Sequence, residues 1–199
     1  MSTPAPIPKF AFSHMGMFVA DIARMRDFYT RVHGFTVTDS GEMQTPRGKM
    51  EFVFLSLDPK DHHQIVLATG RPHELPFNPI NQISFRMAEF AGLREMYRRL
   101  LKEEVKELYP ASHGNALSVY FHDPEGNRIE LFVDTPWYVK QPLRIPMDMR
   151  MSDEELWAWA EREAKKQPGF QPVEQWRAAL TRRMNSGTEP EPVRATSPN

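Results

Sequence analysis

The sequence predicts an α+β fold of two paired βαβββ modules that form an open sheet around a central hollow, followed by a C-terminal helical tail. Three observations support this prediction. Residues 14–31 resemble residues 82–99, each of these segments is followed by three strand patterns, and the composition changes from Pro136 onward. The 199 residues suffice for two small modules that share one core, with an appendage.

The internal repeat is clearest at the start of each module. His14-Met-Gly-Met-Phe-Val-Ala-Asp-Ile lies over Gln82-Ile-Ser-Phe-Arg-Met-Ala-Glu-Phe, and the same offset aligns Tyr29 with Tyr97. In both copies a short apolar strand pattern precedes an acidic residue, which favours the N-terminus of an amphipathic helix. We therefore expect two modules with the same order of elements.

The first module is predicted to span residues 10–70. After the opening strand, a helix is expected from Ile22 to about Val32, because Gly34 is suited to end it. Three strands are then expected at Phe35–Asp39, Glu51–Leu57 and Gln64–Ala68. Turn signals separate them at Ser40-Gly41, from Pro46 to Gly48, and at Asp58-Pro59.

The second module is predicted at residues 80–139, after a Pro-rich connector at 71–79. Its helix is expected from about Ala91 to Glu103, and its later strands at Lys106–Leu108, Ala116–Phe121 and Arg128–Asp134. Turns are expected at Ser112 to Asn115 and at Asp123-Pro-Glu-Gly-Asn127. The second turn is a strong hairpin signal because Gly126 and Asn127 tolerate positive φ.

The remainder is predicted as an extended strap and helical tail at residues 140–185, with a flexible N-terminus at 1–9 and a disordered end at 186–199. Ser152-Asp-Glu-Glu155 forms a capping box that opens a helix to about Lys166. A second short helix is expected over 172–183. The tail tryptophans are expected to dock it on the core or on a second subunit, and these are Trp157, Trp159 and Trp176. The tail is a candidate lid or dimer contact, and we expect a homodimer or higher homo-oligomer.

Composition excludes several classes of function. The formal net charge is −1 and no basic stripe is interleaved with aromatic residues, which argues against nucleic-acid binding and against an anionic membrane surface. No apolar run approaches the ~20 residues of a membrane span. The chain has no cysteine, so disulfides, thiolate nucleophiles and cysteine–zinc sites are excluded. We expect a cytoplasmic protein.

Ligand-capable residues occupy repeat-related positions. His14 and Gln82 open the first strands of their modules, and Glu130 lies on the last strand with apolar neighbours facing the other way. The repeat offset places His62, next to His63, at the position that Glu130 has in the second module. An acidic group on the concave side of a sheet requires a partner, which a cation would supply. The hollow is therefore predicted to bind a metal, although a salt bridge from Glu130 to Arg128 or Arg86 is the alternative.

The stretch Ser112-His-Gly-Asn-Ala-Leu-Ser-Val-Tyr-Phe-His-Asp-Pro-Glu-Gly-Asn-Arg-Ile-Glu-Leu131 resembles the last module of extradiol ring-cleaving dioxygenases. Asp61-His-His-Gln-Ile-Val-Leu67 is similar to their paired-histidine strand. These enzymes belong to the vicinal oxygen chelate superfamily, with glyoxalases and fosfomycin-resistance proteins. The resemblance covers about residues 10–139 and is greatest to one-domain members that act on catechols such as dihydroxybiphenyl.

The resemblance implies a metal site and three further site residues. Members hold Fe(II), or sometimes Mn(II), by two histidines and one glutamate. It implies His14 and Glu130 as ligands here, and Gln82 stands where the second histidine is expected. A glutamine can bind through its carbonyl oxygen, although it is a poorer donor to Fe(II) than histidine. The resemblance implies Fe(II), with Mn(II), Zn(II) or Ni(II) as alternatives. The implied catalytic residues are His63 as an acid–base, His113 in the pocket, and Tyr120 as a hydrogen-bond partner of a substrate oxygen.

The function implied by this resemblance is extradiol cleavage of a catechol-like aromatic substrate with O2. Two alternatives stay open. One is a glyoxalase-like metal-dependent isomerase, lyase or thiol transferase, which is disfavoured because the carboxylate expected near position 64 is Gln64. The other is a non-catalytic protein of the bleomycin-resistance type that binds a small flat molecule.

Overall fold

The computed structural model describes residues 11–46, 48–72, 74 and 78–186. The chain forms two compact units that do not follow the sequence order. Unit 1 contains residues 1–83, 103–106 and 122–128, and unit 2 contains residues 84–102, 107–121 and 129–199. Unit 1 therefore includes two short segments from the second half of the chain. The termini predicted to be flexible or disordered, 1–9 and most of 186–199, lie outside the described residues.

The sheet of unit 1 follows the predicted βαβββ order. Its strands are β1 (Met15–Val19), β2 (Thr36–Thr45), β3 (Gly48–Ser56) and β4 (Ile65–Thr69), arranged β1-β4-β3-β2. β1 and β4 run parallel with Met15 opposite Ile65, and the other pairs are antiparallel. The helix α1 (Ile22–Asp27) continues as one turn of π-helix, η1 (Phe28–Val32). The helix thus ends at Val32 as predicted.

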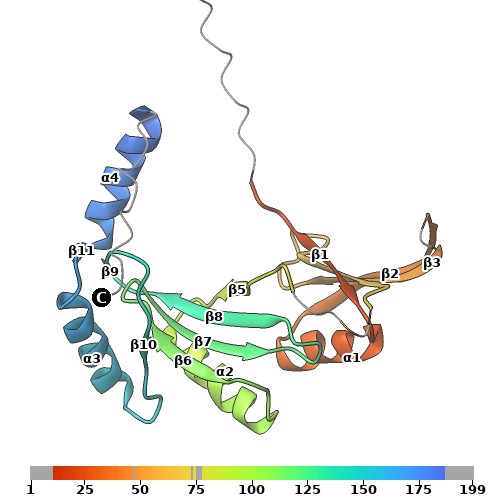
Figure 1. Ribbon diagram of the computed structural model, residues 1–199, viewed down its shortest axis with the longest axis horizontal. Coiled ribbons are helices and arrows are strands. Elements are labelled where there is room, and N and C mark those ends of the chain that lie inside the picture. Colours follow the sequence, from red (N-terminus) through yellow and green to blue (C-terminus); the bar gives the residue numbers. More distant parts are fainter. Residues whose placement is uncertain (1–10, 47, 73, 75–77, 187–199) are drawn as a thin grey trace, which may run out of the picture. The chain divides into compact units, whose positions relative to one another are not determined.

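One face of this sheet packs against the helix and forms the core of unit 1. Alternate residues of β3 and β4 are buried on that face, where α1 contacts both strands (Figure 1). Burial is nearly complete for Val53, Leu55, Ile65 and Leu67. Because side chains alternate along a strand, the residues between them point to the opposite face of the sheet. That opposite face carries Phe52, Phe54 and Val66, which are only half-buried.

The sheet of unit 2 repeats the same order of strands. Its strands are β5 (Ile83–Arg86), β6 (Tyr109–Ser112), β7 (Ala116–His122), β8 (Arg128–Asp134) and β10 (Ile145–Pro146), arranged β10-β6-β7-β8-β5. The helix α2 (Phe90–Lys102) follows β5. In both sheets the first strand of a module borders its last strand. The predicted α+β class and the repeated βαβββ order are therefore confirmed.

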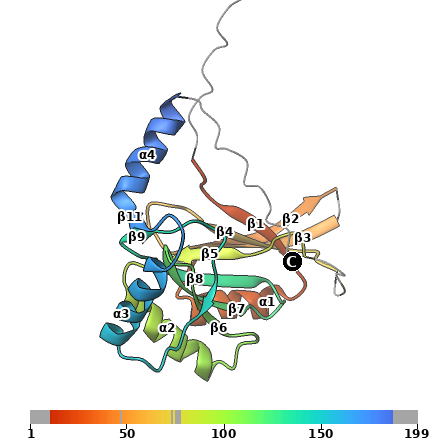
Figure 2. The same ribbon diagram turned by 60° about the vertical axis from the view of Figure 1, so that its left-hand side comes forward.

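The tail forms two helices, α3 (Asp153–Lys165) and α4 (Val173–Ser186), and two short antiparallel strands, β9 (Trp137–Tyr138) and β11 (Gln171–Pro172). The predicted capping box opens α3, with both reciprocal bonds between Ser152 and Glu155 present. The Trp157 ring lies 5.7 Å from that of Phe90, so α3 packs beside α2 (Figure 2). The Trp176 ring stacks on Tyr138 at 4.8 Å. The contact of Trp157 with the buried Phe90 agrees with the prediction that tryptophans dock the tail on the core, whereas Trp176 stacks within the tail itself.

Two local predictions are wrong. Lys106–Leu108 is not a strand, because Glu104 and Glu107 have left-handed φ angles of 51° and 54° that interrupt an extended chain. Ser40-Gly41 is not a turn but lies inside β2, paired with Val53 and Phe52. The strand β2 lies at the edge of the sheet and its residues are exposed. Ser40 and Gly41 therefore need no large side chains to fill a core at this place.

The helices among the described residues include none with the length and apolar character required to cross a bilayer.

We predict that His33 makes unit 1 sensitive to acid. Its ring packs against Phe28 and Tyr29, with centroids 5.3 and 5.4 Å away, and burial lowers the pKa of His33 from 6.5 to about 4. Between these values the unfolded chain binds a proton that the folded chain does not. The free energy of unfolding should therefore fall as the pH decreases from 6.5 to 4, by up to ~3 kcal/mol.

The measurement is urea unfolding at several pH values between 7 and 4 for the wild type, His33→Leu and the exposed control His62→Leu. His33→Leu should flatten the pH dependence in this window, whereas the control should keep the wild-type slope. Parallel curves for all three proteins would contradict the assignment.

Candidate functional site

Three predicted site residues come together in unit 2. Tyr120 lies on β7 and Glu130 on the neighbouring strand β8, and the Tyr120 hydroxyl donates to Glu130 Oε1 at 2.5 Å. His113 lies in the turn between β6 and β7, and its Nε2 is 2.8 Å from the same hydroxyl. The sequence predicted Tyr120 and Glu130 on two strands of one module and His113 in a turn of that module, and the structure joins them in one hydrogen-bonded chain.

A fourth member of this cluster was not predicted. Ser84 on β5 donates its hydroxyl to Glu130 Oε2 at 2.5 Å. Its strand borders β8 in the sheet. A signal was present in the sequence, because Ser84 stands two residues after Gln82 and side chains two apart on an extended segment point to the same side. Each carboxylate oxygen of Glu130 thus accepts a hydroxyl bond.

The orientation of His113 is fixed by the backbone. Its Nδ1 lies 2.6 Å from the carbonyl oxygen of Leu143, and since a carbonyl can only accept, Nδ1 carries the proton. The Tyr120 hydroxyl has one proton, so it can donate to His113 Nε2 or to Glu130 Oε1 but not to both. Both contacts are hydrogen bonds only when the imidazole or the carboxylate carries one further proton. The cluster can therefore hold a proton and deliver it at the Tyr120 oxygen.

Tyr120 and Glu130, at the centre of the cluster, are buried, whereas His113 is half-buried and Ser84 is exposed. Glu130 is 7% exposed and Tyr120 is 5% exposed, and Ile129 and Leu131 beside Glu130 are buried as predicted. Hydrogen bonds in such surroundings are stronger than in water. Arg86, the alternative ion-pair partner of Glu130, instead lies 3.1 Å from Asp134.

The histidines of unit 1 form a separate group. His14 lies exposed just before β1, and its ring centroid is 4.2 Å from that of His63. His63 Nδ1 is 2.9 Å from His62 Nδ1, and the Phe54 ring lies 5.3 Å from the His63 ring. Partial burial, with the His14 and His62 imidazoles nearby, lowers the pKa of His63. Two predicted site residues, His14 and His63, are thus in contact.

The predicted equivalence of His62 with Glu130 is wrong. His62 and His63 do not lie on β4, which begins at Ile65, but in the bend before it. The bend is held by the Gln64 side chain, which accepts from the backbone N–H of Leu57 at 2.9 Å. Since Glu130 lies inside β8, its counterpart lies inside the apolar strand β4.

The donor types of the predicted ligands suit a divalent cation. Gln82 lies exposed just before β5 and belongs to unit 1, as does His14, whereas Glu130 belongs to unit 2. Within the residues that the structure describes, no group of three or more His, Asp or Glu side chains could hold a metal ion. The predicted set contains two such residues and an amide. Imidazole, amide oxygen and carboxylate fit an ion such as Fe(II) or Mn(II) by their chemistry.

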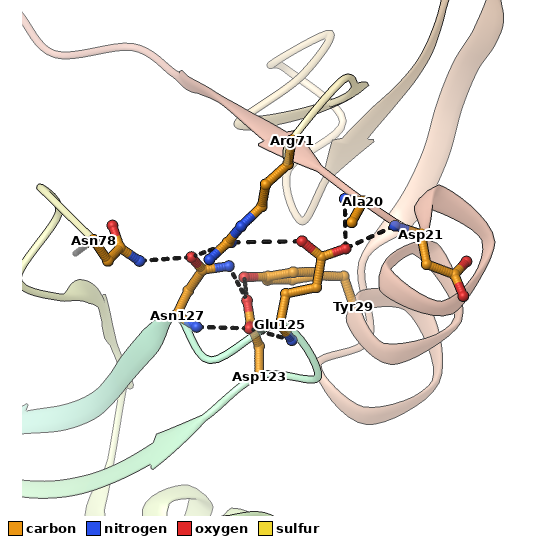
Figure 3. Close-up of polar contacts among 8 residues, drawn as sticks. All are labelled: Ala20, Asp21, Tyr29, Arg71, Asn78, Asp123, Glu125 and Asn127. Carbon is orange, nitrogen blue, oxygen red and sulfur yellow. Dashed lines mark hydrogen bonds and ion pairs between the residues drawn. The ribbon is translucent and has the colours of Figure 1, made fainter. Parts of the chain in front are cut away.

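The turn of residues 123–127, between β7 and β8, contains a second polar cluster (Figure 3). Asp123 is buried and accepts from the backbone of Glu125 and Asn127, from the Asn127 amide at 2.7 Å and from the Tyr29 hydroxyl at 3.2 Å. The Asn127 carbonyl oxygen accepts from Arg71 and Asn78, each at 2.9 Å. Every residue of this group belongs to unit 1.

Glu125 completes the attachment of the turn. One of its oxygens accepts the backbone N–H groups of Ala20 and Asp21 at 2.8 Å, where α1 begins, and the other lies 3.5 Å from Arg71 (Figure 3). Burial raises the pKa of Tyr29 well above its usual value, with Asp123 adding to the effect. Burial likewise raises the pKa of Asp123, against the hydrogen bonds that Asn127 donates. The turn was predicted only as a hairpin, but its polar side chains anchor it to α1 and to the segment after β4.

The chain matches known proteins over the part that contains both modules. A family model described as Glyoxalase/Bleomycin resistance protein/Dioxygenase superfamily matches residues 11–131. The chain is 30% identical over 132 residues to biphenyl-2,3-diol 1,2-dioxygenase 2 of Rhodococcus globerulus, and 29% identical over 86 residues to biphenyl-2,3-diol 1,2-dioxygenase 3 of that organism. These matches cover 64% and 41% of this chain but only 63% and 45% of the relatives.

One solved structure is similar over its whole length. A glyoxylase/bleomycin resistance protein/dioxygenase domain from Frankia sp. EAN1pec has a TM-score of 0.55 and 21% identity, covering 64% of this chain and 100% of that chain. This likeness shows the fold.

We predict that Asn127→Ala destabilises the protein by ~2–4 kcal/mol. The substitution removes the amide that donates to Asp123 and the acceptor of Arg71 and Asn78, and it leaves buried polar groups without these bonds. Urea unfolding followed by circular dichroism measures the change. The exposed control Asn185→Ala on α4 should stay within ~0.5 kcal/mol of wild type. An equal effect of the two substitutions would show that the turn is not anchored through Asn127.

Proposed function

Because the chain belongs to the glyoxalase/bleomycin resistance protein/dioxygenase superfamily, we propose that it is a metal-dependent extradiol dioxygenase. Its substrate would be a catechol-like aromatic molecule, and O2 the co-substrate. The observation that carries this proposal is the hydrogen-bonded chain of His113, Tyr120 and Glu130, which joins a buried carboxylate to two proton-handling groups. The two dioxygenase relatives support the reaction type, since biphenyl-2,3-diol, the substrate in their names, is an aromatic diol.

The proposed metal ligands are His14, Gln82 and Glu130. A bound divalent ion, Fe(II) in the first instance, would supply Lewis acidity and the redox chemistry that couples an aromatic diol to O2. Two neutral donors and one carboxylate leave one positive charge on the ion, which favours a diol that has lost a proton. The Ser84 hydroxyl, bonded to Glu130 Oε2, would hold the carboxylate in a fixed orientation.

The proton handling is assigned to three side chains. Ring opening between two adjacent carbons with both oxygen atoms of O2 needs no further reductant, so the protein has only to move protons and to exclude water. The Tyr120 oxygen would bond to a diol oxygen, and His113 would exchange the proton with it through Nε2. His63, packed on His14, would serve as a second acid–base. A cytoplasmic location and a homodimer or higher oligomer stay predictions from the sequence.

We predict that metal binding and turnover depend on Glu130. Protein purified without oxygen and loaded with Fe(II) should consume O2 with 2,3-dihydroxybiphenyl or a simpler catechol and form a coloured ring-fission product. Glu130→Ala should lower metal affinity and turnover ~100-fold or more, because a charged ligand is lost. The control Glu51→Ala, at an exposed position of β3, should retain both.

Absence of bound metal in the wild type, with equal turnover in both variants, would refute the enzyme proposal. Turnover of another substrate that persists without O2 would assign the protein to the isomerase class instead.

We predict that Gln82→His increases the affinity for Fe(II) by ~10-fold or more, since imidazole is a better donor to iron than an amide oxygen. Competition with a coloured chelator under nitrogen measures this change. The same substitution at exposed Gln44 on β2 is the matched control and should have no effect. Unchanged affinity of Gln82→His would remove Gln82 from the ligand set.

A further inference from the structure

The turn that carries His113 is held by residues that follow β8. Thr135 donates its hydroxyl to the carbonyl oxygen of Gly114 at 2.7 Å and its backbone N–H to that of Asn115 at 3.2 Å. The Gln141 amide donates to the carbonyl oxygen of His113 at 2.7 Å and to Asn115 Oδ1 at 3.1 Å. The three backbone carbonyl groups between β6 and β7 are thus all bonded to this later part of the chain.

Gln141 uses both ends of its amide in this arrangement. It lies half-buried in the segment of residues 139–144, between β9 and β10. While its Nε2 donates to the turn, its Oε1 accepts the backbone N–H of Leu143 at 3.0 Å. The carbonyl oxygen of Leu143 is the group that lies 2.6 Å from His113 Nδ1. One side chain therefore holds both the backbone of the histidine and the group to which its ring is bonded.

The backbone beside Gln141 is also held in place. Lys140 donates its N–H to the carbonyl oxygen of Pro168 at 2.9 Å, just after the end of α3. Gly114 has a positive φ of 74°, and a Cβ at this position would collide with the Val139 side chain. The 139–144 segment therefore lies directly against the turn on one side and is bonded to the helical tail on the other.

We propose that Gln141 is a positioning residue that selects the tautomer of His113. With the Nδ1 proton on the Leu143 carbonyl, a neutral imidazole presents an unprotonated Nε2 to Tyr120. Without that carbonyl in place, either nitrogen could carry the proton, and an Nε2–H cannot accept from the Tyr120 hydroxyl.

The groups that make this selection lie outside the part of the chain that the family model matches, because that match ends at residue 131. The inference thus gives the segment after β9, and the tail to which it is bonded, a role in the acid–base site. The tautomer depends on contacts within unit 2 alone. Its effect on turnover rests on the proposed function.

Nitrogen NMR of the imidazole tests the tautomer without metal, O2 or substrate. The full chain is labelled with ¹⁵N and measured at about pH 8, where an ordinary histidine is neutral. His113 Nδ1 should give the signal of a protonated nitrogen, which is assigned by its loss in His113→Gln. In Gln141→Met, which keeps the length of the side chain but has no amide, the Nδ1 signal should shift toward that of an unprotonated nitrogen.

Gln64→Met is the matched control for this measurement. Gln64 is also half-buried and also uses both ends of its amide, since it accepts from the Leu57 N–H at 2.9 Å and donates to Asp61 at 3.3 Å. It belongs to unit 1, so its loss should leave the His113 signals unchanged. An unprotonated Nδ1 in the wild type would overturn the proposal without any variant. Wild-type His113 signals in folded Gln141→Met would overturn it as well.

Turnover separates this inference from the proposed function. With Fe(II), O2 and a catechol, Gln141→Met should lower kcat ~10-fold or more and change KM less, because proton transfer is impaired rather than binding. Gln175→Met, at an exposed position of α4, should keep the wild-type kcat. A tautomer change in a protein without diol turnover would support the positioning role and refute the enzyme. Diol turnover at wild-type kcat in Gln141→Met would refute the positioning role and keep the enzyme.

Discussion

The anchored turn between β7 and β8 is the constraint on which the proposed chemistry depends. Asp123 donates its backbone N–H to the carbonyl oxygen of Asn127 at 3.0 Å, which sets the register of the antiparallel hairpin. Three residues further from the turn on each strand, Tyr120 lies opposite Glu130. A slip by one residue would send one of the two to the other face of the sheet. The pairing of Asp123 with Asn127 is therefore consistent with the hydrogen bond from Tyr120 to Glu130.

Much of this arrangement was predictable from the sequence, because it is local. A hairpin signal at residues 123–127 with a tyrosine ten residues before a glutamate determines their pairing. The position of His62 was not predictable by the same offset, since β2 and β3 are longer than β6 and β7 and the two modules lose their common numbering after the helix. Ser84 was missed although it stands two residues after Gln82, because the partner of its hydroxyl depends on which strand lies beside β5.

The two modules share a topology but present different surfaces on their sheets. The repeat places Ser84 over Gly16, and in the second module the hydroxyl bonds to a carboxylate where the first module has empty space. The last strands of the two modules also differ in polarity, because β8 carries the acidic Glu130 and β4 carries the apolar Val66. The same positions thus carry small or apolar residues in one module and hydrogen-bonded polar residues in the other.

The proton count within the cluster limits what Tyr120 can do. With the Nδ1 proton of His113 committed to Leu143, the tyrosine hydroxyl is bonded on both sides only when the cluster holds one further proton, and it can then pass a proton in either direction without a change in ring position. A substrate oxygen that bonded to this hydroxyl would replace one of those two contacts rather than add a third. The group that stays bonded to Tyr120 would then be the one that accepts or returns the proton. Because His113 is tied to the backbone at Leu143 and Glu130 to Ser84, neither side chain has to reorganise for that exchange, which is the arrangement expected of a preorganised acid–base site.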